Sequence, residues 1–101
     1  MMSDPTVHIL LVEDDEDDAL LARETLAEVP HGRFRVTWCA TFEAGLGALA
    51  GDGIQVCLLD HRLGAETGLD FLERARTMEP PPPPIILLTG SGNRELDLRA
   101  M

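Results

Sequence analysis

IQVCLLD, at residues 54–60, is the stretch that decides the fold class, because it is an almost unbroken apolar run that ends in a carboxylate. Strands buried on both faces have such continuous apolar sequences, and they occur in parallel sheets covered by helices. Residues 7–12 and 85–88 are two further runs of this kind. Residues 34–39 alternate apolar and polar side chains instead, which predicts a strand at the sheet edge with one wetter face.

Segments with helical spacing lie between these strands. The apolar spacing and the turn residues predict helices over 17–29, 41–50 and 67–78, and a last helix from residue 93 to the end of the chain. Thr41, Thr67 and Asn93 are the N-cap candidates, and Asp70 stands three residues after Thr67, where a carboxylate completes a cap. The regular alternation of strand and helix predicts an α/β fold, a parallel sheet with helices on both faces.

Size and charge limit what the chain can do. Its 101 residues suit a single domain. The net charge of −10, from 18 acidic and 8 basic residues, argues against direct binding of nucleic acid through phosphate contacts. No apolar run is long enough to span a bilayer, and no secretory signal is visible, so we expect a cytoplasmic domain. Cys39 and Cys57 are far apart in sequence, and we expect buried free thiols.

Acidic and hydroxyl side chains follow three of the predicted strands. Glu13 and Asp14 end the first, Asp60 ends the third, and Thr89 ends the fourth. Function collects at the carboxyl ends of parallel strands, so the three carboxylates converge if the first and third strands are neighbours. Such acids repel one another, and Mg²⁺ would remove the repulsion. A carboxylate beside a metal and a hydroxyl is suited to accept a phosphoryl group.

Each of these residues also has an ordinary structural interpretation. The acidic run at 13–18 could simply be solvated or favour a helix N-terminus, and we assign residues 15–18 to that role. Asp60 alone could cap a loop, and only its combination with Asp14 and Thr89 favours function. Trp38 is most simply a packing residue on the edge strand, and His61 a loop residue.

Four segments, taken in order, resemble the receiver domains of two-component response regulators. They are ILLVEDD at 9–15, CLLDHRLG at 57–64, GLDFL at 68–72 and IILLTG at 85–90. The resemblance implies a doubly wound, flavodoxin-like parallel sheet with strand order 2-1-3-4. It also implies a signalling protein that is not an enzyme, because a receiver catalyses at most its own phosphotransfer and dephosphorylation.

The resemblance implies a role for each site residue. Glu13 and Asp14 match the acidic pair that holds Mg²⁺, and Asp60 matches the phosphoacceptor, which also binds the metal. The backbone carbonyl of Arg62 would be a further metal ligand, and Thr89 matches the switch hydroxyl. The implied partners are a sensor histidine kinase or phosphotransfer protein, and an output domain on the same or another chain.

The sequence departs from the family pattern in two places. Gly64 stands where many receivers have proline. The family's switch lysine ends a fifth strand, whereas this sequence reaches Met101 before a fifth strand or fifth helix, and all eight of its basic residues are arginines. We therefore expect residues 1–101 to be a receiver domain that lacks its C-terminal strand and helix. If the chain were complete, the apolar edge at 85–88 would favour a dimer.

Two alternative functions stay open at this point. A pseudo-receiver would use the same fold only as a protein-interaction module, and the missing lysine favours it. An aspartate-nucleophile phosphatase also has a strand-end aspartate and a later Thr-Gly, here Thr89-Gly90. Such phosphatases carry a second acid two positions after the nucleophile, and this sequence has Arg62 there.

Overall fold

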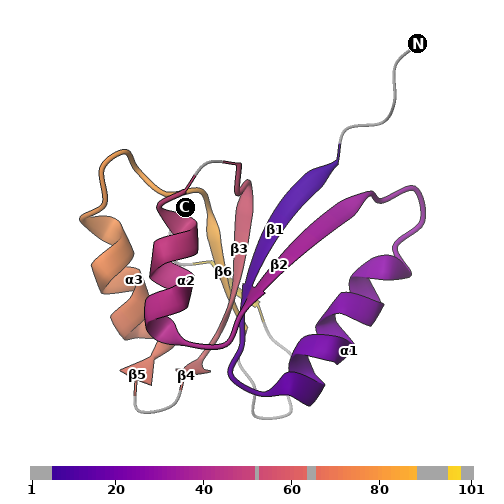
Figure 1. Cartoon of the computed structure of the whole chain (residues 1–101), viewed down its shortest axis with the longest axis horizontal. Helices are drawn as coiled ribbons and strands as arrows, with labels where there is room; N and C mark the ends of the chain where they lie inside the picture. The colour runs from indigo at the N-terminus through magenta and orange to yellow at the C-terminus, as the bar shows by residue number, and fades with distance from the viewer. Residues whose placement is uncertain (1–5, 52, 64–65, 89–95, 99–101) are drawn as a thin grey trace.

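The computed structural model describes residues 6–51, 53–63, 66–88 and 96–98. Its main sheet has the order β2-β1-β3-β6-β7, and its first four strands are parallel (Figure 1). The strands are β1 (Val7–Val12), β2 (Phe34–Cys39), β3 (Val56–Asp60), β6 (Ile85–Leu88) and β7 (Leu96–Leu98). The predicted parallel sheet of order 2-1-3-4 is confirmed, with the alternating segment 34–39 at one edge.

The three helices in the described part of the chain begin where capping side chains satisfy their first N–H groups. They are α1 (Glu16–Ala27), α2 (Phe42–Leu49) and α3 (Gly68–Arg76). Asp15 caps α1 and Thr41 caps α2. Thr67 and Asp70 form a capping box at α3, in which each side chain accepts from the other residue's backbone N–H. The predicted caps at Thr41 and Thr67 are therefore confirmed.

Helices cover the two faces of the sheet unequally. Figure 1 shows α1 on one side and α2 with α3 on the other. Side chains that alternate along the central strands pack with α2 and α3 into one core, whose buried members are Leu10, Val12, Phe42, Leu49, Cys57, Leu59, Phe71, Leu72, Ala75, Ile85 and Leu87. The other side chains of β3 and β6, which point to the opposite face of the sheet, are half-buried. Cys57 is a buried free thiol and Cys39 a half-buried one, close to expectation.

Residues 96–98 differ from the expectation. The prediction of a helix from residue 93 onward is wrong for them, because they form β7 and pair antiparallel with β6. Residues 89–95 and 99–101 lie outside the described ranges. A free strand edge offers unpaired N–H and C=O groups, and β7 satisfies those of β6. The pairing removes the free edge on which the predicted dimer was based.

The segment after β3 also has more structure than the predicted loop. Arg62–Leu63 and Glu66–Thr67 form the short antiparallel strands β4 and β5. This ribbon leads directly into α3, so it places the start of α3 close to the end of β3. No helix in the described part of the chain is long and apolar enough to cross a membrane.

Candidate functional site

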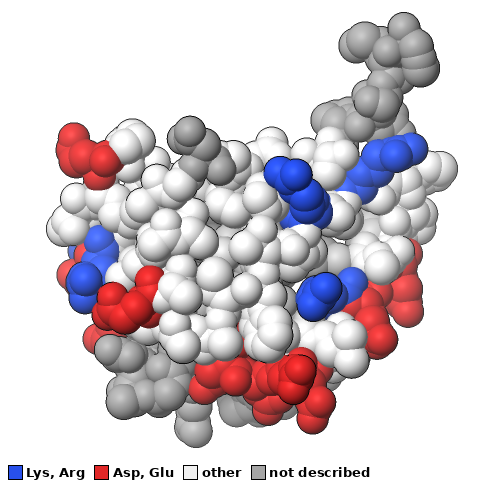
Figure 2. Space-filling view, viewed as in Figure 1, with Lys and Arg blue, Asp and Glu red and all other residues white. Residues whose placement is uncertain are grey.

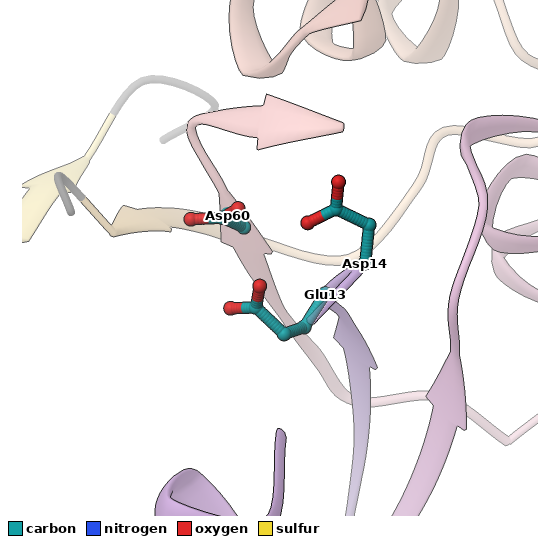
Figure 3. Close-up of side chains that lie close together, drawn as sticks. All are labelled: Glu13, Asp14 and Asp60. Atoms are coloured by element: carbon teal, nitrogen blue, oxygen red, sulfur yellow. The ribbon is translucent and has the colours of Figure 1, made fainter. Parts of the chain in front are cut away.

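Three carboxylates meet where two neighbouring strands end. β1 and β3 pair in parallel, so Glu13 and Asp14, which follow β1, lie beside Asp60 at the end of β3. One oxygen from each of the three side chains lies within 4.8 Å of the other two (Figure 3). In Figure 2 acidic side chains gather along the lower border of the molecule, where these strands end in Figure 1. The sequence-predicted convergence is thus present.

The three acids differ in their exposure to water. Glu13 is buried, with only 6% of its surface exposed, while Asp60 is half-buried and Asp14 is exposed. Burial is the main reason why the pKa of Glu13 rises from 4.5 to about 7, and the charges of Asp60 and Asp18 raise it further. A hydrogen bond from the Asp15 N–H to Glu13 Oε2, 3.2 Å long, acts in the opposite direction. Burial and the neighbouring acids therefore make the charged form of Glu13 less favourable in the folded protein.

Backbone contacts fix the chain around Asp60. The N–H of His61 donates to the carbonyl of Leu88 at 3.1 Å, which joins the ends of β3 and β6. The N–H of Gly68 donates to the carbonyl of His61 at 2.6 Å, so the first residue of α3 lies next to the residue that follows Asp60. A β-carbon at Gly68 would lie 3.1 Å from the carbonyl oxygen of Asp60 and would also clash with Leu87. A larger residue at position 68 would therefore require Leu87 and the end of β3 to shift.

Trp38 contributes to the site, although its sequence context suggested packing alone. Its indole Nε1 donates to the backbone carbonyl of Glu13 at 2.7 Å. The N–H of Glu13 donates to the carbonyl of Cys39 at 3.0 Å. These two hydrogen bonds attach the backbone N–H and carbonyl of Glu13 to the end of β2. A signal was available, because a half-buried tryptophan usually has a partner for its N–H.

The remaining predicted site residues have different outcomes. Arg62 begins β4, two residues after Asp60, and its carbonyl as a metal ligand stays a prediction. Thr89 and Gly64 lie outside the described residues. Asp15 accepts from the N–H groups of Asp17 and Asp18, which agrees with the structural role expected for the second part of the acidic run.

The fold and the site together define a class of protein: doubly wound α/β domains with an acidic pocket at the carboxyl ends of the central strands. The response regulator receiver domain family matches residues 9–101. The chain belongs to this family.

Solved structures of a response regulator agree with this assignment. The MaeR response regulator bound to beryllium trifluoride is 30% identical, with a TM-score of 0.71, over 84% of this chain and 68% of that one. A MaeR mutant bound to sulfate, in which an aspartate is replaced by alanine, is 29% identical, with a TM-score of 0.73, over 88% and 71% of the two chains. No curated protein matches the sequence.

Proposed function

We propose that this receiver domain accepts a phosphoryl group from a histidine kinase or phosphotransfer protein onto Asp60, in a Mg²⁺-dependent reaction that switches an output. The observation that carries the proposal is the convergence of Glu13, Asp14 and Asp60 within 4.8 Å at one strand edge. Membership of the receiver family makes a phosphodonor the expected partner.

The three carboxylates suit a hard divalent cation. Mg²⁺ binds oxygen ligands at 2.0–2.1 Å in an octahedron, so opposite ligands stand about 4.2 Å apart. The 4.8 Å limit on the carboxylate separations is close to that span. Glu13, Asp14 and Asp60 would hold the ion, with the Arg62 carbonyl as a further ligand. Bound there, Mg²⁺ would neutralise charge on the phosphoryl oxygens.

The chain's own residues would carry the transfer. A carboxylate oxygen of Asp60 attacks the phosphorus of a phosphohistidine, the P–N bond breaks, and its electron pair returns to the imidazole nitrogen. The product is an acyl phosphate on Asp60. The contacts of His61 with Leu88 and Gly68 hold the backbone next to Asp60, which keeps the attacking side chain oriented. Thr89 would bring its hydroxyl to the new phosphoryl group and so report the transfer.

The proposal includes the setting of the domain. The output domain would lie on the same or another chain, and the location would be the cytoplasm, where a kinase has access to ATP. The domain would act as the kinase's substrate and catalyse at most its own phosphotransfer and dephosphorylation.

The test is a mass measurement. The protein is exposed to acetyl phosphate with Mg²⁺, and intact-mass spectrometry should detect the addition of one phosphoryl group. The gain should be lost with EDTA, with Asp60→Asn, and after hydroxylamine, which cleaves acyl phosphates. Asp17→Asn, an equivalent change at an exposed position in α1, is the matched control and should keep the gain. An undiminished gain in Asp60→Asn would refute the assignment, and no gain in the wild type would favour the pseudo-receiver.

A further inference from the structure

One hydrogen bond at the site has no part in the proposed transfer. The indole of Trp38 crosses from β2 and donates to the Glu13 carbonyl at 2.7 Å. The β1–β2 register pairs Leu11 with Trp38 and Val12 with Cys39, so the strand pairing ends one residue before Glu13. Beyond that point the Glu13 N–H still donates to the Cys39 carbonyl, and the Trp38 indole N–H donates to the carbonyl of Glu13 itself. The side chain of Trp38 therefore attaches the backbone that follows β1 to β2, beyond the last paired residues of the two strands.

The bonded carbonyl belongs to the peptide that joins the two acids of the pair. A peptide is planar and its plane includes both α-carbons, so ψ of Glu13 and φ of Asp14 set the directions of the two side chains relative to this plane. Fixing the plane limits the directions in which both side chains can leave the backbone. The Asp15 N–H, which donates to Glu13 Oε2, and the Asp15 cap of α1 fix the following residues. The indole hydrogen bond connects β2 to the peptide between Glu13 and Asp14.

We propose that Trp38 is a positioning residue of the metal site: its indole N–H orients the Glu13–Asp14 peptide so that both carboxylates face Asp60 before an ion binds. The inference rests on the proposed function. The carboxylates repel one another when they are ionised, and a backbone held from β2 opposes their separation. Hydrogen-bond partners that orient metal ligands typically change metal affinity by about 10- to 100-fold.

The test compares Mg²⁺ binding by isothermal titration calorimetry in matched variants. Trp38→Phe keeps an aromatic ring and removes the N–H, and Mg²⁺ should bind about tenfold more weakly. The control is Phe34→Leu, which changes a half-buried aromatic residue at the other end of β2 and should bind Mg²⁺ as the wild type does. Urea unfolding of each variant verifies that it is folded.

A second variant separates the N–H from the packing of the ring. Replacing Trp38 by its benzothiophene analogue keeps the bicyclic shape, puts sulfur in place of the N–H, and should weaken Mg²⁺ binding as Trp38→Phe does. Trp38 is the sole tryptophan in the sequence, so the protein has one indole ¹⁵N–¹H resonance. That resonance should move as Mg²⁺ is added to the wild type, with the half-saturation found by calorimetry.

The outcomes distinguish this inference from the proposed function. The wild type could bind Mg²⁺ and become phosphorylated while both Trp38 variants bind Mg²⁺ as tightly as the wild type does. That result would overturn the positioning role of Trp38 and leave the assignment of Asp60 as phosphoacceptor intact. A loss in Trp38→Phe that the benzothiophene analogue does not share overturns the role of the N–H. An indole resonance that stays fixed through a saturating titration also overturns it. A wild type that neither binds Mg²⁺ nor gains a phosphoryl group overturns both.

Discussion

Replacing Glu13 by glutamine should stabilise the metal-free protein at neutral and higher pH. The side chain is buried, and its pKa rises from 4.5 to about 7 in the folded state. Below pH 4.5 both the folded and the unfolded chain hold the proton, so the group leaves stability unchanged. As the pH rises toward 7 the unfolded chain loses the proton first, and the free energy of unfolding falls.

The size of this effect follows from the shift. A rise from 4.5 to about 7 corresponds to about 3.4 kcal/mol at 1.36 kcal/mol for each pH unit. The neighbouring Asp14 is exposed, so water screens part of the interaction within the cluster, and we expect about 2 kcal/mol. The wild type should lose this amount between pH 4.5 and pH 8, and Glu13→Gln should not.

The assay is urea unfolding in EDTA at pH 4.5, 6 and 8. Glu24→Gln removes the same charge at an exposed position of α1 and is the control. The difference in unfolding free energy between Glu13→Gln and the wild type should grow with pH, while the difference for Glu24→Gln should stay nearly constant. Added Mg²⁺ should restore the wild type at pH 8 and should stabilise Glu13→Gln less, because one of the three carboxylates is lost. A constant difference for Glu13→Gln across the three pH values would refute the reasoning.

Two further predictions concern the framework of the site. Gly45→Ala in α2 places a β-carbon 2.9 Å from Val12 and 3.1 Å from Phe71, so we expect a loss of about 1–3 kcal/mol. A β-carbon at Gly47 in the same helix would meet nothing within 4 Å, so Gly47→Ala should be neutral or stabilising by up to about 1 kcal/mol. Thermal unfolding of the two variants tests this pair, and a higher melting temperature for Gly45→Ala than for Gly47→Ala would contradict it. Thr67→Ala removes the capping box of α3 and should lower stability by about 0.5–2 kcal/mol in urea. An unchanged urea midpoint would show that α3 does not depend on this cap.

The sequence by itself determined the architecture of the domain. Nearly unbroken apolar runs at residues 7–12, 54–59 and 85–88 are typical of strands in a parallel sheet covered by helices. The capping residues Thr41 and Thr67 mark helix starts through local hydrogen bonds. The acidic residues at the strand ends could also be found, because strand direction in a parallel sheet places them at a common edge. These features depend on periodicity and on near neighbours in the chain.

Only the tertiary structure decided how the site is held together. The raised pKa of Glu13 depends on burial and on Asp60, which is 47 positions away in the numbering. The contact of Trp38 with the Glu13 carbonyl depends on the register of β2 against β1, and the strand at 96–98 depends on the open edge of β6. A residue's local sequence carries no record of such distant partners. The carboxylates could therefore be predicted from the sequence, whereas the carbonyl that accepts from the Trp38 N–H could not.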